Sequence, residues 1–144
     1  MTIWKSTPTI AQLNAVERGT ISELIGIEIL ELGPDFLRGR MPVDARTHQP
    51  MGRLHGGASA VLAETLGSVA GNLCVEPGQT CVGLEINANH VRAARSGYVT
   101  GTARPVHIGG RIQVWNIEIV DGRGKIVCVS RLTLAIIAPD KIAG

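Results

Sequence analysis

The chain has 144 residues, of which 44% are hydrophobic and 18% charged, a composition that excludes intrinsic disorder and fits one domain with a real core. Only 3% are aromatic and the formal net charge is +2, so we expect no nucleic-acid partner, although this charge would suit an anionic small ligand. Three cysteines without CxxC spacing and four scattered histidines predict neither a disulfide frame nor a metal site.

The amino-terminal third of the chain predicts a short helix followed by a hairpin. The helix is expected at about residues 10–18, with Thr9 as its N-cap. Residues 25–32 alternate between apolar and polar and should pair with residues 36–43 across a Gly-Pro-Asp turn. The first residues lack the apolar core of a signal peptide, and no run reaches the ~18 apolar residues of a membrane helix. These features predict a cytoplasmic protein without a membrane partner.

The stretch from Leu54 to Val75 predicts the longest helix, centred on about residues 56–73. At about 100° per residue, its large apolar side chains gather on one face and its small side chains on the other. The large face holds Leu62, Leu66, Val69 and Leu73, and the small face holds Gly57, Ala60, Glu64, Gly67, Ser68 and Gly71. Glu64 is the only charged residue of this stretch, and it has no basic partner three or four positions away. A carboxylate in such a setting is costly unless it has a use.

After this helix the sequence period changes to two, which predicts strands. They are expected at residues 80–88, 98–106, 111–120 and 125–137. Two strands, one long helix and four strands predict an α+β fold in which an antiparallel sheet curls around the helix. The helix should bury its leucine face in the sheet, and a second subunit should cover its small face. We therefore expect an obligate dimer.

A second candidate group lies at the start of the long helix. Gln49, His55, Gly56 and Gly57 gather there, where backbone N–H groups lack internal partners and carry the positive end of the helix dipole. Such an end can bind an oxyanion or polarise a carbonyl oxygen. Glu64 lies about 12 Å further along by helix rise. Glu64 and the helix start of the same chain are therefore too far apart to bind one small group together. An antiparallel two-fold partner could bring its own Glu64 to this end.

Each of these residues also has a structural interpretation. Glu64 could be a buried carboxylate bonded to Ser68, and His55 could simply cap the helix. Gln49 could be an ordinary loop amide, and Ser68 fits a close contact better than a nucleophile because no Ser-His-Asp arrangement is visible. The basic residues of 89–95 and 107–111 stand at strand ends and could hold phosphates, or could belong to solvated loops.

Four segments of the chain resemble a known family. HGGASAVLAETLGSVAG with the upstream Gln49, then VGLEINANHVRAAR, PVHIGGR and QVWNIEI, are similar to the hotdog-fold acyl-CoA thioesterases. The branch is the one that contains 1,4-dihydroxy-2-naphthoyl-CoA thioesterase and the Arthrobacter-type 4-hydroxybenzoyl-CoA thioesterase. The resemblance covers about residues 3–137 and implies one hotdog domain over residues 1–144.

The resemblance also implies roles for individual residues. Glu64 would be the catalytic carboxylate, as nucleophile or as general base on water. The Gly56 N–H would polarise the thioester carbonyl, Gln49 and His55 would orient thioester and water, and Ser68 would contact the acyl part. The residues implied to line the CoA and acyl groove are Gly83, His90, Val91, Arg92, Ala93, His107, Ile108, Gly109, Gly110, Arg111 and Ile112.

The resulting hypothesis is hydrolysis of an aryl- or acyl-CoA thioester to a carboxylic acid and free CoA, with the CoA thioester as substrate and no cofactor. The implied assembly is at least a homodimer, and a homotetramer built as a dimer of dimers. Two alternatives stay open at this point. One is a hotdog hydratase or dehydratase acting on acyl-thioesters, and the other is a non-catalytic acyl-CoA-binding protein in which Glu64 is structural.

Overall fold

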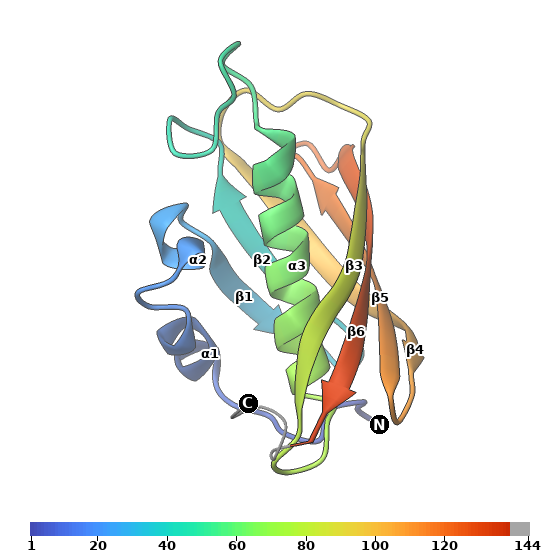
Figure 1. Cartoon of the computed structure of the whole chain (residues 1–144). Helices are drawn as coiled ribbons and strands as arrows, with labels where there is room; N and C mark the ends of the chain where they lie inside the picture. The colour runs from blue at the N-terminus through green and yellow to red at the C-terminus, as the bar shows by residue number, and fades with distance from the viewer. Residues whose placement is uncertain (139–144) are drawn as a thin grey trace.

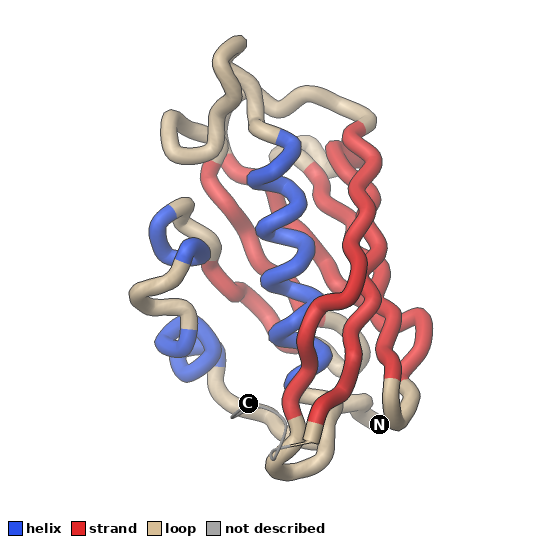
Figure 2. Tube along the Cα trace, viewed as in Figure 1, coloured by secondary structure: helices blue, strands red, loops and turns tan. Residues whose placement is uncertain are grey.

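A computed structural model describes residues 1–138 as one antiparallel sheet curled around a single long helix (Figures 1 and 2). The six strands lie in the order β1-β2-β4-β5-β6-β3, and every neighbouring pair is antiparallel. The elements are α1 (Ile10–Val16), α2 (Ile21–Leu24), β1 (Glu28–Leu32), β2 (Leu37–Pro42), α3 (Gly56–Asn72), β3 (Thr80–His90), β4 (Tyr98–Ile108), β5 (Ile112–Val120) and β6 (Ile126–Ile137). The α+β hotdog architecture expected from the sequence is confirmed.

The amino-terminal segment confirms the first helix and adds a second. Thr9 caps α1 in a capping box with Gln12, and α1 ends at Val16 rather than at residue 18. The four-residue helix α2 was not predicted; its cap is Thr20, whose hydroxyl accepts from the Ser22 N–H. Because α2 takes up residues 21–24, β1 begins at residue 28 rather than at 25. Local capping thus overrides the alternating pattern here.

The faces of α3 differ from the sequence expectation at two glycines. Gly67 and Gly71 are buried against the sheet instead of lying on a free face. A Cβ on Gly67 would stand 2.5 Å from Leu132 Cδ2, and one on Gly71 would stand 2.4 Å from Leu134 Cδ1. The glycines therefore let the leucines of β6 fill the space beside the helix backbone. Val69, expected on the leucine face, is only half-buried.

A buried polar contact fixes the last turn of α3 to the sheet. Gln113 of β5 is fully buried, and its Nε2 donates to the Gly71 carbonyl at 3.2 Å. Its Oε1 accepts a hydrogen bond from Trp115 Nε1 at 2.8 Å. Both polar ends of the side chain are thereby satisfied inside the core. Across residues 1–138, no helix is long and apolar enough to cross a membrane.

Candidate active site

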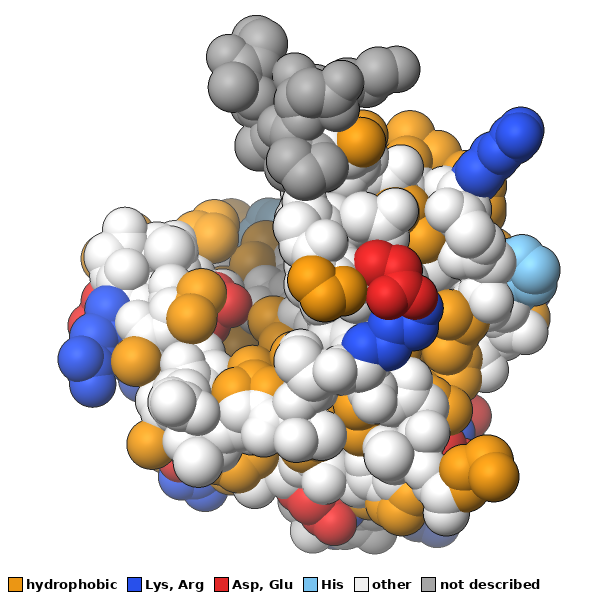
Figure 3. Space-filling model, turned by 90° about the horizontal axis from the view of Figure 1, so that it is seen from below, with side chains coloured by type: hydrophobic (Ala, Val, Ile, Leu, Met, Phe, Trp, Pro, Cys, Tyr) orange, Lys and Arg blue, Asp and Glu red, His pale blue; other side chains and the backbone are white. Residues whose placement is uncertain are grey.

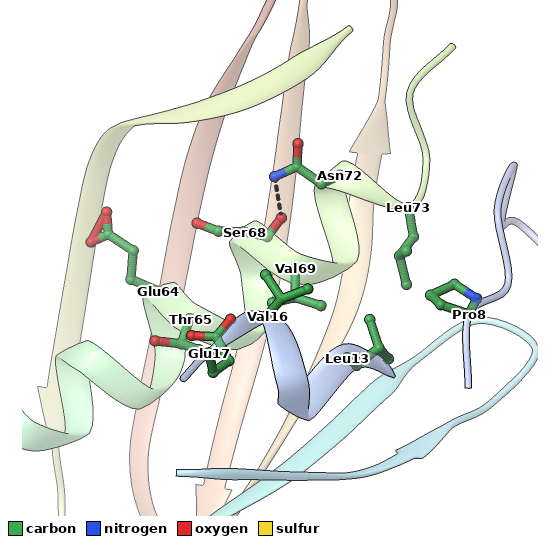
Figure 4. Close-up of a pocket in the computed structure, with 10 residues that line it drawn as sticks. All are labelled: Pro8, Leu13, Val16, Glu17, Glu64, Thr65, Ser68, Val69, Asn72 and Leu73. Carbon is green, nitrogen blue, oxygen red and sulfur yellow. Dashed lines mark hydrogen bonds between the residues drawn. The ribbon is translucent and has the colours of Figure 1, made fainter. Parts of the chain in front are cut away.

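Glu64 lies midway along α3, at one end of an elongated cavity of about 510 Å³ between α3 and α1 (Figure 4). The lining is mainly apolar, and Figure 3 shows the hollow from below, with hydrophobic side chains along its walls. The lining residues are Pro8, Leu13, Val16, Glu17, Glu64, Thr65, Ser68, Val69, Asn72 and Leu73. Within residues 1–138, no ion pair and no hydrogen bond to Ser68 holds the Glu64 carboxylate. The structural alternative of a Glu64–Ser68 hydrogen bond is therefore not observed.

The Glu64 side chain reaches across to β3, where Gly83 makes room for it. A Cβ built on Gly83 would stand 2.7 Å from Glu64 Oε1, closer than ordinary van der Waals contact. Any side chain at this position would displace the carboxylate. The structure thus brings together two of the residues that the family resemblance implied.

The start of α3 leaves one backbone donor open. His55 is the N-cap, and its Nδ1 accepts from the Gly57 N–H at 2.7 Å, so the neutral ring carries its proton on Nε2. The Gly56 N–H makes no hydrogen bond in the described part of the chain. The His90 ring lies directly beside Gly56, since a Cβ there would stand 2.8 Å from His90 Nε2. His55 therefore does cap the helix. Because its ring occupies the Gly57 N–H, the Gly56 N–H is the donor that stays free at this helix end.

A second cavity, of about 450 Å³, opens at this helix end. It is lined by Gln49, Arg53, Leu54, Gly56, Ser59, His90, Val91, Arg92, Ala93 and Val127. Gln49, Gly56 and the segment 90–93, predicted separately from the sequence, thus share one site. Arg53 was not predicted: its Nε is buried and has no hydrogen-bond partner among the described residues. A buried guanidinium donor without a partner is available to an anion or a carbonyl oxygen.

Within one chain, the two cavities are separate. Glu64 lines one and Gly56 the other, and eight residues of continuous helix separate them, about 12 Å. The predicted segment 107–112 lies elsewhere again, at the β4–β5 turn near the other end of α3. There the Gly109 N–H donates to the Ile112 carbonyl, and the Arg111 carbonyl accepts from the Ile136 N–H. Within one chain, the segment 107–112 and residues 90–93 therefore do not form one site.

The α1 wall of the Glu64 cavity was also missed at the sequence level. Leu13 is buried, whereas Val16 is 76% exposed and Glu17 half-buried, yet all three line the cavity. An exposed valine beside a glutamate at the end of a short helix was the available signal, but alone it resembles ordinary surface.

Thiol and metal chemistry receive no support from the described residues. Burial raises the pKa of Cys74 and of Cys81 to about 11, which holds both thiols in the unreactive protonated form. Within residues 1–138, no group of three or more His, Cys, Asp or Glu side chains is placed to hold a metal ion.

Comparisons with known proteins identify the family of this chain. The model of the family described as "Thioesterase superfamily" matches residues 51–128. The chain is 56% identical to the 1,4-dihydroxy-2-naphthoyl-CoA hydrolase of Escherichia coli (strain K12) over 135 residues, covering 94% of this chain and 99% of that protein.

Two crystal structures are similar throughout. Thioesterase HI1161 from Haemophilus influenzae has a TM-score of 0.94 and 51% identity, covering 96% of both chains. A Q49A variant of thioesterase PA1618 from Pseudomonas aeruginosa has a TM-score of 0.94 and 48% identity, covering 95% of this chain and 99% of that one. These similarities show that the chain belongs to the thioesterase superfamily and is a thioester hydrolase.

Proposed function

We propose that this protein hydrolyses an aryl- or acyl-CoA thioester to a carboxylic acid and free CoA, and that Glu64 is its catalytic carboxylate. The observation that carries the proposal is the position of Glu64 in a mainly apolar cavity, with no basic partner in the described chain. A carboxylate without a neutralising partner is available to attack a carbonyl carbon or to deprotonate water. The CoA substrate is favoured by the relative from Escherichia coli, which is named for a CoA thioester.

The Gly56 N–H is proposed as the donor to the thioester oxygen. It stands at the positive end of a 17-residue helix, and the neighbouring Gly57 N–H is already bonded to His55. His55 Nε2–H and the Gln49 Nε2 amide group are then available to orient the thioester or the attacking water, since Gln49 Oε1 already accepts from the Met51 N–H. The unpaired Arg53 Nε adds a cationic donor in the same cavity. Together these donors polarise the thioester carbonyl. Attack on its carbon forms a tetrahedral intermediate, and the CoA thiolate leaves when that intermediate collapses.

A complete site is proposed to form between two chains. The distance of about 12 Å along α3 prevents Glu64 from attacking a carbonyl held on its own Gly56. A two-fold partner with an antiparallel α3 would place its Glu64 at this Gly56. The outer edge of β3 pairs with no strand among residues 1–138 and exposes Val82 and Leu84, which favours a partner on that side. Assembly into a homotetramer and a cytoplasmic location stay predictions.

The test is hydrolysis of benzoyl-CoA by wild type and by E64Q. We expect the variant to lose at least about a hundredfold in kcat, the usual scale for a general base or nucleophile. Single-turnover reaction in ¹⁸O-labelled water then separates the two roles, because label that first enters the Glu64 carboxylate identifies a nucleophile. Unchanged hydrolysis by E64Q would overturn the assignment of Glu64.

A further inference from the structure

Helix α1 supplies the wall of the cavity that faces α3. Leu13 and Val16 give this wall apolar surface, and Glu17 gives it a charge (Figure 4). On the α3 side stand Thr65, Ser68 and Val69. An acyl group bound with its thioester at Glu64 would therefore lie against α1.

The position of α1 is fixed rather than loose. Asn14 Nδ2 donates to the Ile29 carbonyl at 3.0 Å, and Asn14 Oδ1 accepts from the Ile29 N–H at 2.8 Å. Downstream, the hydroxyls of Ser22 and Thr65 lie 3.2 Å apart and join the α2 segment to α3. The backbone at Glu17 is held between these two attachments, and the Thr20 hydroxyl lies 3.5 Å from Glu17 Oε2, to which it donates.

The charges that line this cavity all have one sign. Glu17 and Glu64 are its ionisable side chains, and no Lys, Arg or His is present among the described residues that line it. The cavity at Gly56 is the reverse, with Arg53, His90 and Arg92 and no acidic residue in its described lining. An acyl group that enters the Glu64 cavity thus meets a negative field over an apolar wall.

We propose that Glu17 is a specificity-determining residue that makes the enzyme discriminate against thioesters whose acyl group carries a carboxylate. This inference rests on the proposed function, because it takes the Glu64 cavity as the acyl site. A second carboxylate there is repelled by Glu17, and none of the described residues that line this cavity within the chain is a cation. For charges about 6–8 Å apart at an effective dielectric of about 40–80, the repulsion from Glu17 corresponds to about a two- to tenfold change in kcat/KM.

The test compares benzoyl-CoA with 4-carboxybenzoyl-CoA and measures the ratio of their kcat/KM values. We expect the carboxylated substrate to gain in the order wild type, Glu17→Gln, Glu17→Lys, with about a two- to tenfold rise in its relative kcat/KM at each step. The discrimination should also weaken in high salt, since Glu17 is partly exposed. The matched control is Glu118→Gln, which makes the same charge change at an exposed position on β5 outside the cavity and should leave the ratio unchanged.

Two results would overturn the inference in distinguishable ways. If wild type hydrolyses benzoyl-CoA and the ratio is the same in Glu17→Gln and Glu17→Lys, then Glu17 does not set specificity while the proposed function stands. If wild type hydrolyses neither substrate nor any other acyl-CoA of a panel, the proposed function fails and the inference falls with it. Circular dichroism spectra of both variants should match wild type, because Glu17 lies outside the core.

Discussion

Gly83 offers a way to move the Glu64 carboxylate without removing it. A Cβ at this position would stand 2.7 Å from Glu64 Oε1, whereas ordinary contacts begin at 3.4 Å. In Gly83→Ala the carboxylate must therefore retreat by about 0.7 Å. The retreat costs little folding free energy, because Oε1 is the far end of a flexible side chain and the next nearest side-chain atom outside Glu64, Leu132 Cδ1, is 4.0 Å away.

The same small movement should be expensive in catalysis. A displacement of about 1 Å of a reacting group can cost about a hundredfold in rate. We expect Gly83→Ala to lower kcat/KM for benzoyl-CoA by about 10- to 100-fold, while its melting temperature stays within about 3 °C of wild type. Steady-state kinetics and a thermal melt of the same preparation measure both quantities.

The matched control is Gly122→Ala, since a Cβ on Gly122 meets nothing within 4 Å and this glycine has no positive φ. It should retain wild-type activity. A double-mutant cycle with Glu64→Asp adds a second check, because the shorter side chain should make the added methyl less harmful. Wild-type kcat/KM in Gly83→Ala would refute the reasoning, since the carboxylate would then not act from the position it occupies beside β3.

Two further predictions concern stability and thiol chemistry. Gln113→Leu should lower the free energy of unfolding by about 2–4 kcal/mol in urea titrations, because the Gly71 carbonyl and Trp115 Nε1 lose their buried partner; a loss below about 0.5 kcal/mol would contradict this. Cys74 and Cys81 should resist Ellman's reagent at pH 8 in the native protein and react after unfolding, and rapid native labelling would count against their burial. Their pKa values rise from 9.0 to about 11 on folding, so the folded state holds more protons between these values and stability should fall as pH rises from 9 to 11.

Much of the fold follows from periodicity that is visible in the sequence. The switch from a helical period to a period of two near residue 80 predicted α3 and the four strands after it. The predicted ends of α3 and of these strands agree with the observed ends within two residues. The start of α3 at Gly56 and its end before the turn residues that follow are signals that depend on the local sequence alone. The exception is α2, whose single capped turn is too short to show a period.

The packing of α3 could not be predicted from its own sequence. Helical spacing placed Gly67 and Gly71 on the same face as Glu64, yet both are buried against β6. The outcome depends on Leu132 and Leu134, which lie more than sixty residues further along the chain. A glycine is equally consistent with a free face and with a close contact, and only the partner strand decides between them.

The candidate site was predictable where residue type alone carries the chemistry. The lone carboxylate of Glu64 and the glycines after His55 could be identified in this way. Arg53 and Glu17 could not, because an arginine in a polar loop and a glutamate after a short helix resemble solvated surface. Their significance comes from the cavities that they line, and those cavities exist only after folding.

The proposal of a shared site can be tested by complementation between two inactive variants. Gly56→Pro removes the N–H proposed to polarise the thioester. Proline is tolerated at the first helical position, and His55 already has the extended conformation (φ −70°, ψ 132°) that proline requires of the preceding residue. Proline also adds a Cβ that would stand 2.8 Å from His90 Nε2, so the exposed His90 ring must shift to make room for it. Glu64→Ala removes the carboxylate that is proposed to be catalytic. Each variant alone should be inactive, and circular dichroism checks that each is folded.

The deciding measurement is benzoyl-CoA hydrolysis by the two variants co-expressed in equal amounts. In a two-fold dimer, half of the molecules are mixed, and each mixed dimer has one site with both residues intact. We therefore expect about a quarter of the wild-type kcat. A mixture no more active than either parent would contradict a site in which Glu64 of one chain acts on a thioester held at Gly56 of the other.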